Sequence, residues 1–243
     1  MKLPEILNKH SHFLESTLRL SNEITFEKRT TLPWDSKCGG CPYLENMNDY
    51  PIGANKKPMM FLAQLNLEEM PSLPNFPSKG LLQFYIEDND CLGYDDKCTV
   101  RYIPEYKKST LQAISRNPYE DQYVGHTPFN HEGKMIFTQR EMLISTECDT
   151  FHDRFFDKVS KDEWNALYDV CYAEGSRVNG YPLFVQSPPE YYDENKYDLL
   201  LQLDVDDTCG IMFGDSGNCT FIISKEDLIN LNFENVYYDW QCC

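Results

Sequence analysis

Polar side chains recur two residues apart in two related apolar segments, and they are the best candidates for a ligand site. The first segment carries Gln64 and Asn66, and the second carries Gln202, Asp204 and Asp206. Residues two apart on a β-strand face the same side of a sheet, so each set is expected to share one face. Amide and carboxylate oxygens in such an array can hold a cation or a basic ligand, and neighbouring carboxylates can share a proton.

Asp215 completes the candidate site, within the segment Gly214-Asp215-Ser216-Gly217. This segment echoes the nucleophile motif of serine proteases, but no histidine lies in a matching triad context. The residues after Asp204 echo an EF-hand loop, yet Cys209 stands where that loop requires glycine. A structural interpretation competes with the ligand site: polar residues at strand ends cap turns and brace loops. It applies equally to all six candidates, which are Gln64, Asn66, Gln202, Asp204, Asp206 and Asp215.

The ten cysteines include two close pairs, Cys38 with Cys41 and Cys242 with Cys243. A structural zinc site needs two separated knuckles, and only the first pair has that spacing. We therefore expect free thiols, with no metal and no cofactor, although the sequence leaves open whether either pair binds metal or is redox-active. His126 and His131 are interpreted as solvent-facing residues of a loop.

The overall charge excludes several classes of function. The chain has 39 acidic and 22 basic residues and a formal charge of −17, so it lacks the basic surface that binds nucleic acid or anionic membranes. No apolar run is long enough to cross a bilayer, and the N-terminal residues lack the pattern of a signal peptide. We expect a cytoplasmic protein whose partner, if it has one, is a basic protein.

Hydrophobic periodicity places the elements that would position these residues. Pro4 and the spacing of apolar residues predict a helix over 4–16, and the capping box from Ser160 to Glu163 begins a second helix over 160–174. A short helix is expected to follow Ser224. Residues 31–57 are expected to form a loop. Alternating or buried apolar runs predict strands near 18–26, 59–65, 82–86, 99–103, 135–144, 183–186, 198–205, 210–213, 219–223 and 236–240.

An internal repeat organises these elements. Gly40-Cys41-Pro42 matches Gly180-Tyr181-Pro182 at an offset of 140, and Leu62–Asn66 matches Leu200–Asp204 at an offset of 138. Gly80 with Phe84 and Ile86 matches Gly217 with Phe221 and Ile223 at an offset of 137. Such ordered matches predict two units, near 30–103 and 176–243, that cannot bury their faces alone. Residues 104–175 would connect them.

The predicted architecture is therefore a single compact α+β domain spanning residues 1–243. It would contain mainly antiparallel sheets from two duplicated units related by pseudo-two-fold symmetry. An N-terminal helix and the central helix near 160–174 would complete it, and the central helix would either cover the junction of the units or lead into the second one.

Several of these motifs, taken in order, resemble the YwqG-like family. The resemblance runs from about residue 30 to the C-terminus and rests on Ser36–Pro42, Phe61–Leu67, Gly80–Tyr85, Gly180–Pro182, Leu199–Asp207 and Gly214–Gly217. It implies a bacterial, intracellular domain of unknown function, with no established catalytic residues to carry over. Some members of that family resemble components of toxin–immunity gene neighbourhoods. Cys38 and Cys41 do not look like part of the family pattern.

Two functions of different class follow from these observations. The first is a protein-binding or immunity-type module that neutralises a basic partner through an acidic surface, because complementary charge speeds encounter and sets specificity. The second is a small-ligand or metal-binding enzyme with its site at the junction of the repeats. There Gln64, Gln202 and Asp204 would orient the ligand, and Asp206 or Asp215 would act as a base or cation ligand.

Overall fold

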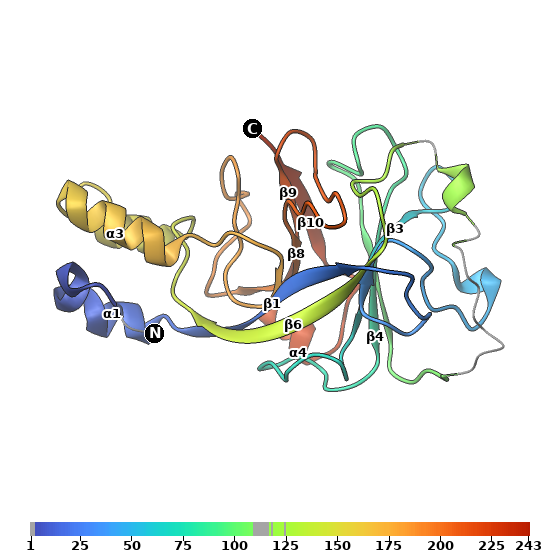
Figure 1. Cartoon of the computed structure of the whole chain (residues 1–243), viewed down its shortest axis with the longest axis horizontal. Coiled ribbons are helices and arrows are strands. Elements are labelled where there is room, and N and C mark those ends of the chain that lie inside the picture. Colours follow the sequence, from blue (N-terminus) through green and yellow to red (C-terminus); the bar gives the residue numbers. More distant parts are fainter. Residues whose placement is uncertain (1–2, 109–116, 118, 124) are drawn as a thin grey trace.

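The strands form one continuous sheet of ten strands in the order β10-β9-β8-β7-β1-β6-β2-β3-β4-β5 (Figure 1). The computed structural model describes residues 3–108, 117, 119–123 and 125–243. The strands are β1 (Arg19–Lys28), β2 (Lys37–Cys38), β3 (Met60–Asn66), β4 (Leu81–Ile86), β5 (Thr99–Ile103), β6 (Gly133–Met142), β7 (Arg177–Val178), β8 (Tyr197–Leu203), β9 (Asn218–Ser224) and β10 (Tyr237–Gln241).

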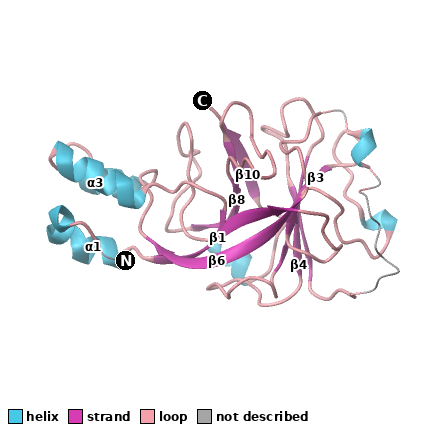
Figure 2. Cartoon of the chain, viewed as in Figure 1, coloured by secondary structure: helices cyan, strands magenta, loops and turns pink. Residues whose placement is uncertain are grey.

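Helices are few and short. The α-helices of the described residues are α1 (Ser11–Ser16), α2 (Asp149–Phe155), α3 (Lys161–Cys171) and α4 (Lys225–Ile229). The 3₁₀ helices among the described residues are η1 (Glu5–His10), η2 (Met47–Asp49) and η4 (Glu120–Gln122). Figure 2 shows α1 and α3 together at one end of the molecule, away from most strands. The prediction of a mainly antiparallel sheet with few helices is confirmed.

The long strands β1 and β6 form the centre of the sheet. They pair antiparallel from Arg19 opposite Met142 to Lys28 opposite Gly133. Ile24 and Phe26 point from β1 into the core, while the alternate residues Glu23 and Glu27 face solvent. Four strands extend outward on each side of this pair, β2-β3-β4-β5 on one side and β7-β8-β9-β10 on the other.

The two outer groups of strands fold over and bury one shared core. Leu62, Leu65 and Phe84 from one side belong to the same cluster as Leu203 and Phe221 from the other. The rings of Phe84 and Phe221 are 4.9 Å apart at their centroids, in an edge-to-face arrangement. Figure 1 shows the corresponding arrangement, with β3 and β4 facing β8, β9 and β10 across the curved β1–β6 pair. Burial of this apolar surface is the main stabilising contribution to the fold.

A second core forms between the helices and the loops beside β8. Leu7, Leu14, Phe151, Phe155 and Leu167 pack together there, in a cluster that extends to apolar residues of β8 and β9. The central helix therefore packs against the N-terminal helical segment and leads into β7. It does not cover the junction of the two strand groups, which lies toward the other end of the molecule (Figure 2).

Two predicted strands are wrong. Residues 183–186 lack strand pairing, since the Leu183 N–H is donated to the Gln202 side chain (2.8 Å) and not to a neighbouring strand. Residues 210–213 contribute only single bridges, Ile211 to Asp206 and Phe213 to Gly217, within tight turns. Conversely, helix α2 and the two-residue strands β2 and β7 were not predicted, because short elements carry too few residues to show a period.

Candidate functional site

Gln64 and Gln202 are fully buried and serve as matching braces for two loops. The Gln64 Oε1 accepts the Tyr43 N–H at 3.0 Å, and its Nε2 donates to the carbonyls of Pro33 (2.8 Å) and Asp35 (2.9 Å). In the other strand group, the Gln202 Oε1 accepts the Leu183 N–H at 2.8 Å. Its Nε2 donates to the carbonyl oxygens of Ala173 (3.0 Å) and Gly175 (2.8 Å). Each amide thereby satisfies three backbone groups that burial would otherwise leave unpaired.

Asn66 and Asp204 occupy the next inward-facing positions and bond in a related way. The backbone N–H of Asn66 is donated to the Ser36 Oγ (2.8 Å), and that of Asp204 to the Ser176 Oγ (2.9 Å). The Asp204 carboxylate accepts the Gly175 N–H at 2.6 Å. The structure thus brings Gln64 together with Asn66, and Gln202 with Asp204, but each pair holds its own loop.

Asp206 and Asp215 lie on the surface beyond β8. The Asp206 carboxylate accepts the Cys209 N–H at 2.9 Å and closes a turn, whereas Asp215 is exposed at the tip of the turn between Phe213 and Gly217. The six predicted site residues are therefore distributed among two internal braces and one surface loop. Their assignment to a ligand site remains a prediction.

The loop over residues 126–132 joins the two strand groups at their junction. The N–H groups of Asn130 and His131 are both donated to the Cys209 carbonyl, at 2.9 Å and 3.1 Å. The Met212 N–H is donated to the Pro128 carbonyl at 2.9 Å. The loop leads directly into β6, so it ties the centre of the sheet to the 206–217 loop. Two cavities open on either side of it and share Thr127, Phe129 and Asn130.

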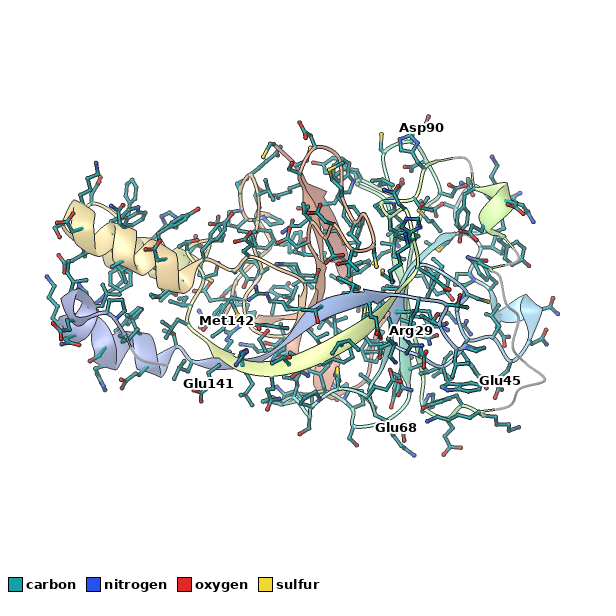
Figure 3. The ribbon with its side chains drawn as sticks, in the orientation of Figure 1. Arg29, Glu45, Glu68, Asp90, Glu141 and Met142 are labelled. Atoms are coloured by element: carbon teal, nitrogen blue, oxygen red, sulfur yellow. The ribbon has the colours of Figure 1, made fainter. Side chains whose placement is uncertain are left out.

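The larger junction cavity, of about 540 Å³, is lined by side chains of both charges. Lys28, Arg29 and His131 contribute to its wall together with Glu120 and Glu132, and Arg29 also pairs with Glu27 (3.2 Å) and Asp35 (3.8 Å). Both Glu132 carboxylate oxygens are held by Thr31, through its N–H and its hydroxyl, each at 3.2 Å. Figure 3 shows Arg29 close to the end of the β1–β6 pair. Lys28 and Arg29 are basic groups that an anionic ligand could contact, and Glu120 and Glu132 offset their charge within the same lining.

The smaller junction cavity, of about 290 Å³, is walled mainly by apolar groups. Trp240, Met212, Phe129 and Leu92 form its sides, and Asp90 lies at its rim. Figure 3 places Asp90 at the outer edge of the molecule. Sequence reasoning missed this cavity, because its residues come from four segments that are separated in the chain and no local motif links them.

The loop over residues 87–98 packs against the edge strand β10 next to this cavity. The Tyr238 hydroxyl donates to the Leu92 carbonyl at 2.8 Å, and the Trp240 indole N–H donates to the Cys91 carbonyl at 2.9 Å. Burial, with a smaller contribution from the nearby Asp95 carboxylate, raises the pKa of Asp239. Exposed or partly exposed carboxylates lie on this loop, on and just before β10, and on the 206–217 loop that shares the cavity with Asp90, and Lys97 is the basic residue beside Asp95, Asp96 and Glu234. We call these carboxylates the acidic face, comprising Asp90, Asp95, Asp96, Asp206, Asp207, Asp215, Glu234 and Asp239.

The cysteines take separate environments. Cys38 is buried beside Cys209 from the other strand group, and the contact with Cys209 together with burial raises the pKa of the Cys38 thiol. Its sequence neighbour Cys41 instead donates to the Pro42 carbonyl at 3.5 Å, and burial raises the pKa of that thiol to about 11. In the part of the chain that the structure describes, no three His, Cys, Asp or Glu side chains cluster as metal ligands would.

Among the described residues, no helix is both long enough and apolar enough to span a membrane.

Comparison with known proteins places the chain in a family. No curated protein matches the sequence. A family model described as a domain of unknown function, DUF1963, matches residues 36–242, which is most of the chain. The narrower resemblance to YwqG-like proteins remains a prediction. This chain therefore belongs to the DUF1963 family of domains of unknown function.

Proposed function

We propose that this protein is an acidic binding module that captures a basic protein partner on the acidic face. The observation that carries the proposal is the docking of the 87–98 loop on β10, since it brings the exposed carboxylates of that loop to the strand that carries the partly exposed ring of Trp240. Tyr94 is among the exposed large hydrophobic residues and its ring lies 6.0 Å from that of Trp240, whereas Tyr237 alternates to the other side of β10 and stacks on Tyr191 at 4.4 Å.

This combination of residues suits protein recognition. Carboxylates that outnumber nearby cations, as Asp95, Asp96 and Glu234 outnumber Lys97, speed the encounter with a basic partner and disfavour acidic competitors. Tyr and Trp contribute most of the binding energy in many interfaces, because they bury a large area at a low cost in conformational entropy. Stoichiometric capture of this kind is how an immunity-type protein would act. The ten free thiols support a cytoplasmic location for the module.

The test compares two variants that carry the same change in net charge. The first neutralises part of the acidic face through Asp90→Asn, Asp95→Asn, Asp96→Asn and Glu234→Gln. The matched control neutralises four exposed carboxylates at the helical end through Glu15→Gln, Asp153→Asn, Asp157→Asn and Asp169→Asn. Each tagged protein is used to capture partners from cells that produce it, at low and physiological salt, with stoichiometry determined by quantitative mass spectrometry.

We expect the wild type and the matched control to recover one basic protein near one-to-one. The variant of the acidic face should recover at least about tenfold less, since four exposed charge pairs each contribute up to about 1 kcal/mol. Equal loss in both variants would indicate a dependence on net charge alone. Equal recovery by all three proteins would place the interface elsewhere.

A second candidate function is binding, or turnover, of a small anionic ligand in the larger junction cavity. The presence of Lys28, Arg29 and His131 in one wall favours it. The alternative location at Gln64, Asn66, Gln202 and Asp204 is less accessible, because these side chains are buried and already bonded to their loops. Native mass spectrometry of the purified protein tests both locations. Retention of an anionic metabolite that Arg29→Ala abolishes would support the cavity.

We also infer that the domain consists of two duplicated units, near 30–103 and 176–243. The outward strand order β2-β3-β4-β5 has the same form as β7-β8-β9-β10, which supports the inference. A shift of register interrupts β3 between Phe61 and Ala63, and another interrupts β8 between Leu199 and Leu201. The matching hydrogen bonds of Gln64 and Gln202 add support that is independent of the strand order.

A further inference from the structure

The geometry points to a specific role for the smaller junction cavity: it receives the side chain of an arginine from the basic partner. This inference rests on the proposed function and adds the chemistry of the anchor residue. Asp90 of the acidic face lines the cavity, and its volume of about 290 Å³ is just below the range for small-molecule pockets, about 300–1,000 Å³. It therefore suits one long side chain better than a cofactor.

The indole of Trp240 forms a fixed aromatic wall. Its N–H is donated to the Cys91 carbonyl at 2.9 Å, and its ring meets the edge of Tyr94 at a centroid distance of 6.0 Å. A ring held in this way loses little entropy when a ligand binds. Guanidinium groups are attracted to the face of tryptophan by its quadrupole and stack on it.

Gly214 makes room for this ring. The residue has a φ of +60°, and a Cβ at this position would lie 2.8 Å from the Cζ3 of Trp240 and 2.7 Å from the Cys242 Sγ. No other residue type fits without displacing the indole. The turn before β9 is therefore part of the wall, although its sequence resembles a protease motif.

The remaining wall suits the aliphatic part of a long cationic side chain. Met212 is 48% exposed, and its backbone is held by the hydrogen bond to Pro128. Phe129 and Leu92 belong to the main core and do not need a ligand to stay in place. Arginine buries its methylene groups along such apolar surface while its charged end stays close to water and to carboxylates.

The charges around the cavity favour a cation. Asp90 is one of the lining residues and lies at the outer edge of the molecule (Figure 3), and the described lining contains neither lysine nor arginine. His126 is the other ionisable residue of the lining. The larger cavity, which shares the 126–132 loop, differs because Lys28 and Arg29 line it together with Glu120 and Glu132. Only the smaller cavity therefore offers a carboxylate without a lysine or arginine in its described lining.

The experiment titrates the labelled full-length protein with N-acetyl-arginine amide and follows the indole N–H resonances by NMR. The neutral isostere N-acetyl-citrulline amide is the matched probe. Comparison with the spectrum of Trp240→Phe assigns the Trp240 resonance, and the indoles of Trp34 and Trp164 serve as internal references. Two variants at the wall and rim, Asp90→Asn and Met212→Lys, are expected to fold because both side chains are exposed.

We expect a saturable shift of the Trp240 indole with the arginine probe and at least threefold weaker binding of the citrulline probe, about the effect of a cation–π contact. Asp90→Asn should weaken arginine binding roughly 2- to 5-fold. Met212→Lys should abolish it while the reference indoles keep their native positions. Equal binding of both probes, or no shift of Trp240, would overturn the inference.

The failures of the two proposals are distinguishable. If the basic partner is captured through the acidic face but the arginine probe leaves Trp240 unmoved, the anchor is wrong and the binding function stands. If the probe binds but no partner is captured, the cavity recognises arginine and the proposed function fails.

Discussion

At the scale of single residues, replacing a buried glutamine tests whether its side chain holds the neighbouring loop in place. Replacement of Gln202 by leucine leaves three backbone groups, of Leu183, Ala173 and Gly175, without their partner. Each unsatisfied buried group costs about 1–3 kcal/mol, so the free energy of unfolding should fall by at least about 3 kcal/mol. Urea denaturation measures this change.

Gln122→Leu is the matched control, because Gln122 is exposed on η4 and the same substitution there should change stability by less than about 0.5 kcal/mol. A loss below about 1 kcal/mol for Gln202→Leu would show that the side chain is not needed as a brace. That result would favour the alternative, a ligand site, which the spacing of Gln202 and Asp204 predicts.

The buried ammonium group of Lys37 should make the free energy of unfolding depend on pH. Its ammonium group is buried and donates to the carbonyls of Leu32 (2.6 Å) and Cys41 (2.8 Å), and burial lowers its pKa to about 8. The unfolded chain holds this proton up to a pKa of about 10.4. Between those values the unfolded state binds more protons, so this group makes stability rise with pH, by up to roughly 3 kcal/mol.

The measurement compares the wild type with Lys37→Met by chemical denaturation at several values between pH 7 and pH 10.5. The difference between the two proteins isolates Lys37, because the cysteines that also titrate in this range are common to both. We expect the wild type to gain stability relative to the variant as pH rises through the window. A constant difference would mean that the ammonium group keeps its ordinary pKa in the fold.

The start of helix α3 is the clearest test at the scale of elements. Ser160 and Glu163 form the capping box that the sequence predicts, and Glu163 also bonds Lys9 (2.7 Å) and His10 (3.2 Å) of the N-terminal segment. The hydrogen bonds from Lys9 and then from Ser160 lower the pKa of Glu163 to about 2. This carboxylate therefore couples the cap to the packing of the first helix.

Glu163→Gln should lower the melting temperature at neutral pH, because the charged partner of Lys9 is lost. The stabilising contribution of a carboxylate with a lowered pKa is present above its unfolded pKa of about 4.3 and disappears as pH falls toward about 2. The difference in melting temperature between the two proteins should shrink over that window. Asp169→Asn, in the same helix but exposed, should show a small and pH-independent effect.

The second prediction at the scale of elements concerns Gly133, where the two strand groups are in contact. A Cβ at Gly133 would lie 2.2 Å from the Cys209 Sγ and 3.3 Å from the Cys38 Sγ. Gly133→Ala should destabilise the fold by about 1–3 kcal/mol through overpacking. The same substitution should cost less in a Cys209→Ala background, since the closest clash is removed. Equal costs in a double-mutant cycle would show that this contact is not close.

The sequence predicted the longer elements well and the short ones poorly. Strands β3, β4 and β9 and the capped helix α3 combine clear periods with start and stop signals, so each was found within a few residues. Residues 183–186 are apolar enough to look like a strand, but their N–H groups are satisfied partly by the Gln202 side chain, which no local pattern reveals.

The candidate site was less predictable than the fold. Asp206 and Asp215 were predicted to act in a ligand site at the junction of the repeats, and that assignment stays a prediction. The structure places both residues in surface turns. The cavity beside them depends on Trp240, Met212 and Asp90, which only the tertiary structure brings together. Sequence spacing describes one element at a time, whereas this site is made where a loop of one strand group docks on the edge strand of the other.

At the scale of the whole molecule, the helical region and the region around β10 have different features. The helical end, with α1 and α3, contributes a second core and stability. The region where the 87–98 loop, the 206–217 loop and β10 meet, away from the helices, carries the acidic face and the smaller junction cavity. Under the proposed function, the net charge of −17 would attract a basic partner to the whole surface, and the acidic face would determine where it binds.

The most direct test of this assignment is a hydrogen-exchange footprint of the captured complex, compared with the free protein by mass spectrometry. The account predicts that protection on binding is confined to residues 88–98, 206–217 and 237–241, and that helices α1 and α3 exchange as in the free protein. Protection centred on the helices or on the exposed side of β1 and β6, with none at β10, would contradict it.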